Sequence, residues 1–189
     1  MRTDSAPEAR ALLITGTVGA GKTSVAEAAG DLLAGSGVPN AVLAGSGVPN
    51  AVIDMDWLCR SRPAPADDRF NFALLVRNLR CMVGNYLDAG VTRLVLAGVV
   101  EDAEDREQCA KAVGVGLSVC RLRVELPVVR QRLSRRHADE PEALRWHLDR
   151  SGELDGILDR ARVEDFTVDA THHRVDEAAA AVLEAAGWR

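Results

Sequence analysis

Short apolar runs alternate with longer amphipathic segments along this chain. Five runs are each short enough for a buried strand of a parallel sheet, at residues 11–15, 51–54, 93–97, 117–124 and 166–168. Between and after them, apolar residues at helical spacing predict helices over residues 22–33, 70–88, 103–113, 127–137, 142–161 and 176–186. Such an order predicts an α/β domain whose ligands gather at the carboxyl ends of the strands.

The length of the chain limits its organisation. With 189 residues it suits one domain with a substantial core and is short for two. Residues 1–10 are polar, so we expect a flexible N-terminus followed by a single domain over residues 11–189. The segment LAGSGVPNAV occurs twice in succession, at 33–42 and 43–52, and we interpret the extra copy as a loop insertion. The second copy should form the strand, because it leads directly into the carboxylates at 54 and 56.

Charge and cysteine content exclude several classes of partner. A net charge of -5 and a pI near 5.4 argue against sequence-independent binding of nucleic acid, which needs a basic face. No apolar run is long enough to span a membrane and no signal peptide is evident, so we expect no membrane partner. The four cysteines form no CxxC pair, which indicates free thiols in a cytoplasmic protein.

One motif indicates the chemistry. The segment Gly16–Thr23, GTVGAGKT, matches GxxxxGK[ST] without a mismatch and lies between a predicted strand and a predicted helix. Glycines let such a loop wrap a phosphate with its N–H groups, and the helix dipole adds positive charge. Lys22 would reach the β and γ phosphates, and Thr23 would ligate Mg²⁺. The predicted nucleotide-binding residues of this P-loop and the helix start are Gly16, Thr17, Val18, Gly19, Ala20, Gly21, Lys22, Thr23 and Ser24.

The second predicted strand ends in two carboxylates, Asp54 and Asp56. Residues two apart on a strand face the same way, so these groups would repel each other unless a cation is shared between them. We favour Asp54 for the metal and Asp56 as the base that accepts the proton of an attacking hydroxyl, although the two roles are interchangeable at this stage. The alternative is that one Asp caps the following helix and the other is solvated.

Other P-loop classes fit the sequence less well. No Asn-Lys-x-Asp segment is present for guanine recognition, and the run 93–97 ends without the aspartate that motor and helicase ATPases place there. The Asp-x-Asp strand end, Arg60, Asp68-Arg69 and Arg77 or Arg80 instead resemble the adenylyl-sulfate kinase, shikimate kinase and gluconate kinase group of small-molecule kinases. The resemblance extends from Ala11 to about Arg136.

This resemblance implies a three-layer P-loop NTPase fold with a mostly parallel five-stranded sheet, helices on both faces and a small helical lid. It also implies transfer of the γ-phosphate of ATP to a hydroxyl of a small molecule, with ATP and Mg²⁺ required. The alternative function is an ATP-dependent binding or regulatory module without a small acceptor. Oligomeric state is open, with a homodimer as one option.

Arginines of the predicted helix 127–137 are candidates for contacts to the transferred phosphate. Arg132 and Arg136 are four residues apart and share a helix face, so both are chosen as catalytic residues and Arg132 also as a nucleotide contact. A solvated basic helix face is the alternative. The lid would be residues 137–153, interrupted at Pro141 and Gly152, and the resemblance places Thr171 in a loop that contacts adenine.

The acceptor should bind within residues 57–90. Aromatic rings there offer flat apolar surface, and arginines offer positive charge for an anionic or hydroxyl-rich acceptor. The candidates for acceptor binding are Asp56, Trp57, Arg60, Arg69, Phe72, Arg77 and Arg80.

Overall fold

The computed structural model describes residues 8–35, 47–68 and 70–188, and five strands in them form a single sheet. The strand order is β2-β3-β1-β4-β5, and all of these pairings are parallel. The strands are β1 (Arg10–Thr15), β2 (Asn50–Asp54), β3 (Arg93–Ala97), β4 (Gly116–Arg123) and β5 (Phe166–Asp169). The predicted parallel sheet is therefore confirmed.

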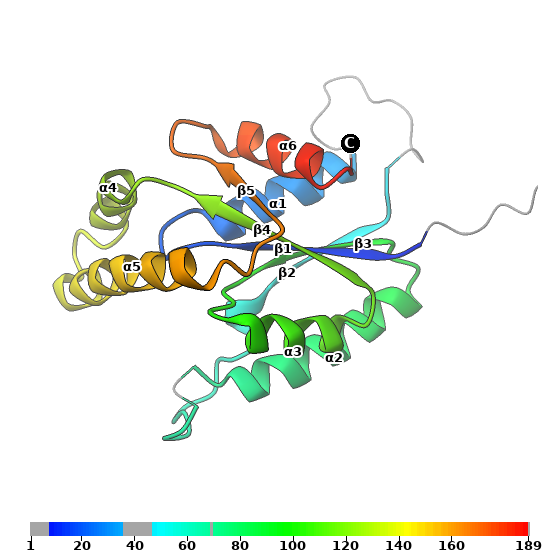
Figure 1. The fold of residues 1–189 in the computed structure, drawn as a ribbon, viewed down its shortest axis with the longest axis horizontal. Helices are drawn as coiled ribbons and strands as arrows, with labels where there is room; N and C mark the ends of the chain where they lie inside the picture. The colour runs from blue at the N-terminus through cyan, green and yellow to red at the C-terminus, as the bar shows by residue number, and fades with distance from the viewer. Residues whose placement is uncertain (1–7, 36–46, 69, 189) are drawn as a thin grey trace, which may run out of the picture.

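Helices cover both faces of this sheet, as predicted for a three-layer fold (Figure 1). Helices α1 and α6 lie on one face, α2 and α3 lie on the other, and α4 and α5 lie beyond the carboxyl end of β4. A 3₁₀ turn, η1, follows β2 directly. The bounds are α1 (Lys22–Leu33), η1 (Met55–Trp57), α2 (Phe72–Asp88), α3 (Ala103–Val113), α4 (Leu126–Arg136), α5 (Pro141–Ala161) and α6 (Val175–Ala185).

The central strand β1 divides the core into two halves. Alternate residues of a strand face opposite sides, so Leu12 and Ile14 pack with α1 and α6, whereas Ala11 and Leu13 pack with α2 and α3. All four side chains are buried. Burial on both faces explains why this strand reads as a continuous apolar run and fixes the position of the loop that follows it.

The register brings the carboxyl ends of three strands to one level. Ala97 of β3 is paired with Ile14 of β1 on one side and with Asp54 of β2 on the other. Gly98 follows, and a Cβ atom built on it would lie 2.6 Å from the sulfur of Met55. Met55 is fully buried, so close packing of η1 against Gly98 holds the turn that carries the two carboxylates.

Several boundaries differ from the sequence predictions. The second copy of the repeated segment supplies β2, as expected, while residues 36–46 lie outside the described part of the chain, as do residues 1–7. Gly152, predicted to interrupt the lid, lies inside the continuous helix α5, because a single glycine in a packed helix costs only about 1 kcal/mol. Pro141 is instead the first residue of α5, where the missing N–H has no consequence.

The structure also describes the state of the cysteines and the apolarity of the helices. Cys59, Cys81, Cys109 and Cys120 are all free thiols. Among the described residues, no helix combines the length and apolarity needed to cross a membrane.

Replacing Gly98 by Ala should lower the free energy of unfolding by about 1–3 kcal/mol, because the added methyl group overpacks the contact with Met55. Gly116→Ala is the matched control, since a Cβ there meets nothing within 4 Å, and it should change stability by less than about 0.5 kcal/mol. Urea unfolding followed by circular dichroism measures both. Equal stability of the two variants would contradict the proposed role of the contact.

Candidate functional site

The P-loop connects the end of β1 to the start of α1. Gly19 and Gly21 have φ angles of 83° and 97°, in the left-handed region that glycine adopts without strain. Gly21 is the residue immediately before α1, and the N-terminal end of the helix opens at the loop. Because the first N–H groups of a helix lack partners within it, this end favours an anionic group such as phosphate.

Lys22 lies at the floor of a cleft beside this loop. Its ammonium group donates a hydrogen bond to the carbonyl of Thr17, with an Nζ–O distance of 3.1 Å. Burial lowers the pKa of Lys22, and the charges of Asp56 and Asp54 oppose that shift. Lys22 is therefore the cation expected near the paired carboxylates.

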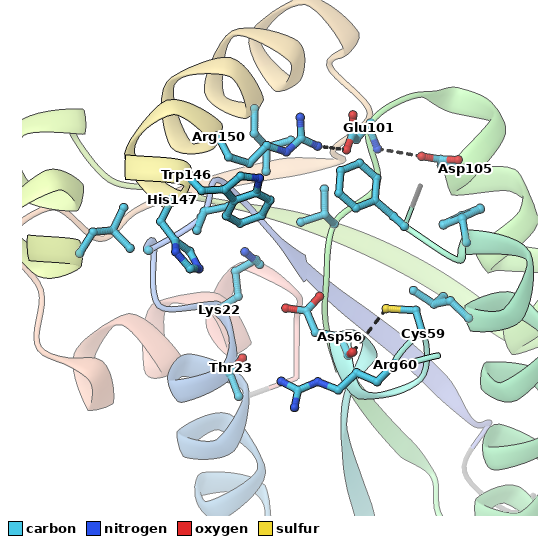
Figure 2. Close-up of a pocket in the computed structure, with 18 of the residues that line it drawn as sticks. Lys22, Thr23, Asp56, Cys59, Arg60, Glu101, Asp105, Trp146, His147 and Arg150 are labelled. Atoms are coloured by element: carbon cyan, nitrogen blue, oxygen red, sulfur yellow. Dashed lines mark hydrogen bonds and ion pairs between the residues drawn. The ribbon is translucent and has the colours of Figure 1, made fainter. Parts of the chain in front are cut away.

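The two carboxylates have distinct environments. Asp54 accepts a hydrogen bond from the hydroxyl of Thr23 at 3.1 Å through Oδ2, and another from the backbone N–H of Asp56 at 2.9 Å through Oδ1. The second bond caps η1, so Asp54 fulfils the capping role that was considered as an alternative. Asp56 is exposed and lines the cleft, where its side chain lies across from Lys22 (Figure 2).

The Thr23 hydroxyl and the Asp54 carboxylate are oxygen donors of the kind that Mg²⁺ prefers. No group of three or more His, Cys, Asp or Glu side chains within the described ranges is arranged to hold a metal. This donor set fits Mg²⁺, which usually takes only one or two carboxylates from the protein and further oxygens from nucleotide phosphates and water.

A cleft of about 790 Å³ extends from the P-loop to α2, α3 and α5. It brings together many of the predicted site residues, which come from four separate segments of the chain. Those lining it are Val18, Gly19, Gly21, Lys22, Thr23, Ser24, Asp56, Arg60, Phe72, Arg132 and Arg136. The remaining loop residues Gly16, Thr17 and Ala20, together with Asp54, adjoin this lining without being part of it.

Other predicted acceptor residues lie away from the cleft. Trp57 is 65% exposed, and the guanidinium of Arg60 stacks over its ring at 3.7 Å. Arg77 and Arg80 are exposed on α2, which turns its buried residues Leu75, Leu79 and Val83 toward the core. Their roles stay predictions that this geometry does not support. Arg69 lies outside the described residues.

The residues outside the P-loop that were predicted to contact the nucleotide or its transferred phosphate lie in two different places. Arg132 of α4 donates to the carbonyl of Ala20 at 3.2 Å, and Arg136, one turn later, is exposed at the cleft. Thr171 lines a different hollow, of about 280 Å³, and its hydroxyl oxygen accepts a hydrogen bond from the N–H of Glu125 at 3.1 Å.

Residues that the sequence analysis missed form the wall opposite the P-loop. Arg150 of α5 is buried and makes an ion pair with Glu101, which follows β3 (Figure 2). It makes a second ion pair with Glu153 at 2.9 Å. One residue further on, the carbonyl of Ser151 accepts a hydrogen bond from the Thr17 hydroxyl at 2.6 Å. Helix α5 is thus joined both to the P-loop and to the end of β3. Glu101 could have been anticipated from its position after a parallel strand, whereas Arg150 gave no local signal.

Comparisons with known proteins establish the fold. No family model matches this chain, and no curated protein matches it in sequence. Among solved structures, Mycobacterium tuberculosis APS kinase in complex with AMPPNP and APS is 23% identical, with 96% of this chain and 99% of that chain covered at a TM-score of 0.60. The Deinococcus radiodurans tunicamycin resistance protein is 16% identical, with 96% and 98% covered and a TM-score of 0.65. Shikimate kinase from Acinetobacter baumannii, in complex with shikimate, is 18% identical, with 96% and 94% covered and a TM-score of 0.58.

These similarities extend over nearly the whole chain. The protein has a P-loop NTPase fold, as the resemblance predicted, and shares it with these solved structures. At identities of 16–23% these similarities show the fold alone.

Replacing Lys22 by Ala should weaken binding of AMPPNP by about tenfold or more, because it removes the cation at the floor of the cleft. Lys111→Ala is the matched control, since Lys111 is the only other lysine and pairs on the surface with Glu107. Isothermal titration calorimetry in the presence of Mg²⁺ measures both affinities. Unchanged affinity in the Lys22 variant would exclude the P-loop as the nucleotide site.

Proposed function

We propose that this protein is an ATP-dependent, Mg²⁺-requiring phosphotransferase that acts on a hydroxyl group of a small molecule. The observation that carries the proposal is that the two paired carboxylates have different environments. Asp54 is fixed beside Thr23, where a metal would be held, while Asp56 is open to the cleft across from Lys22. A carboxylate open to the cleft is what the removal of a proton from an acceptor hydroxyl requires.

In the proposed reaction, the oxygen of the acceptor hydroxyl forms a bond to the γ-phosphorus, and Asp56 accepts the proton of that hydroxyl. The bond between that phosphorus and the β,γ-bridging oxygen breaks, and ADP leaves with the electron pair. Lys22, Arg132 and Arg136 stabilise the negative charge of the moving phosphoryl group. Thr23 and Asp54 would hold Mg²⁺, which neutralises phosphate charge when bound.

The remaining sites are proposals with unequal support. Arg60 and Phe72 line the cleft and are proposed to contact the acceptor. Residues 137–153, the turn before α5 and its first half, are proposed as the cover of the site, and Thr171 as a contact of the adenine side. A cytoplasmic location agrees with the free thiols.

The alternative of a regulatory module without an acceptor predicts an exposed apolar groove beside the P-loop. The hollow between the P-loop and residues 59–75 is instead a cleft of about 790 Å³, lined by both charged and aromatic side chains. This shape favours the enzyme.

Replacing Asp56 by Asn should reduce phosphoryl transfer to the acceptor by about 100-fold or more, because the base is lost. Affinity for AMPPNP should change less than threefold, or about 0.7 kcal/mol. Product formation is measured by mass spectrometry and nucleotide affinity by calorimetry, with Asp88→Asn, an exposed carboxylate at the end of α2, as the control. Equal loss of both quantities would contradict the role of Asp56.

Replacing Asp54 by Asn should raise the Mg²⁺ concentration that gives half-maximal nucleotide binding, by about tenfold. Asparagine caps helices as well as aspartate does, so η1 should be retained and thermal stability should change little. Titration of Mg²⁺ at fixed ATP analogue measures the shift. An unchanged Mg²⁺ requirement would remove Asp54 from the metal site.

A further inference from the structure

The half of the cleft away from the P-loop is rich in carboxylates. Apart from Asp56, its described lining contains two arginines, Arg60 and Arg150, against five acidic residues. The acidic residues are Asp67, Asp68, Glu101, Asp102 and Asp105. This balance is the reverse of what a site for an anionic acceptor requires.

The two arginines of this half differ in how their charges are compensated. Arg150 is only 8% exposed and pairs with Glu101 and Glu153, so its guanidinium is neutralised where it meets the cleft. An anionic acceptor would have to displace Glu101 from that pair. Arg60 stacks on the exposed ring of Trp57, a contact that orients the guanidinium and leaves its charge in place. Arg60 alone therefore opposes the negative charge of the five carboxylates.

The carboxylates around the start of α3 lie close enough to influence one another. Asp105 accepts a hydrogen bond from the N–H of Glu101 at 3.2 Å, and Asp102 accepts one from the N–H of Asp105 at 2.9 Å. Burial raises the pKa of Asp105, and the charges of Asp102, Glu101 and Glu104 raise it further. The acceptor wall thus has a negative potential that a bound cation would relieve.

Aromatic rings complete this half of the cleft. Phe70 and Trp146, 44% and 43% exposed, line it together with Phe72, and the guanidinium of Arg150 lies 5.0 Å from the centre of the Phe70 ring. Aromatic faces attract cations and also cover the apolar faces of small rings. The wall therefore combines two features that recognise an organic ammonium group.

We propose that the acceptor is an amine-bearing alcohol, such as an amino sugar or an aminocyclitol, whose ammonium group is bound by the carboxylates of Asp102 and Asp105, beside the Arg150–Glu101 pair, while its hydroxyl faces Asp56. This inference rests on the proposed function and narrows its acceptor class. It sets aside the anionic acceptor considered from the sequence. Asp68 takes no part, because both of its carboxylate oxygens are occupied by the N–H groups of Phe72 and Ala73 at the start of α2, at 2.7 and 3.0 Å. Asp102 caps α3 through one oxygen only.

The test compares two matched sets of probes that differ in charge. They are glucosamine, glucose and glucuronate, and 2-deoxystreptamine, scyllo-inositol and quinate. Affinity for the protein loaded with Mg²⁺ and AMPPNP is measured by calorimetry, and phosphorylation with Mg²⁺-ATP by mass spectrometry. In at least one set the amine should bind about tenfold or more tightly than its neutral and acidic counterparts. Preference for an acid, or no preference for the amine in either set, would overturn the inference.

Two variants locate the recognition. Asp102→Asn should weaken amine binding by about fivefold or more while keeping the α3 cap and the melting temperature, because asparagine also caps helices. Glu101→Gln should weaken amine binding and strengthen binding of the acidic probes, because it frees the charge of Arg150. Asp31→Asn, a surface carboxylate on α1, is the control and should leave both affinities unchanged. Unchanged amine affinity in Asp102→Asn would exclude this wall as the ammonium site.

The two readouts separate this inference from the proposed function. Preferential binding of amines without any phosphorylated product would support the ammonium site and contradict the phosphotransferase. Phosphorylation of the neutral or acidic alcohols in preference to the amines would support the phosphotransferase and overturn the ammonium site.

Discussion

The hydrogen bond between Thr23 and Asp54 is the interaction on which the proposed site depends. It joins the first turn of α1 to the end of an edge strand, although β3 lies between β1 and β2 in the sheet. The bond can form because β3 ends in Ala97 and is followed by Gly98, and the small size of these two residues leaves room above the strand end for η1 and its buried Met55. This contact thereby links the nucleotide half of the cleft to the turn that carries Asp56.

Asp54 also shows that two interpretations of a sequence need not exclude each other. Capping of η1 and a place beside the metal were alternatives for the sequence, because each explains an acidic residue at a strand end. The carboxylate has two oxygens, and in the structure one accepts from the turn while the other accepts from Thr23. The capping bond orients the carboxylate so that its second oxygen faces Thr23. The structural role of Asp54 therefore places this oxygen where the proposed metal would be held.

The strands, the helices and the P-loop could be predicted from the sequence because their signals are local. Buried parallel strands are short apolar runs, and the loop motif is contiguous. The wall opposite the loop could not be predicted from the sequence. Its ion pair between Arg150 and Glu101 joins residues that are 49 positions apart, and neither position predicts the other. The exposure of Arg77 could have been predicted from the sequence, because the apolar residues Leu75, Leu79 and Val83 recur at helical spacing and define the inner face of α2.

The hydrogen bond from Thr17 to Ser151 has a consequence for how two ligands of the cleft would influence each other. It connects the main chain of α5, which presents Trp146 and Arg150 to the cleft, to the P-loop. In the proposed phosphotransferase, nucleotide and acceptor would contact two elements that this bond joins. We therefore expect each to change the affinity for the other by the same factor, so that the two bind cooperatively.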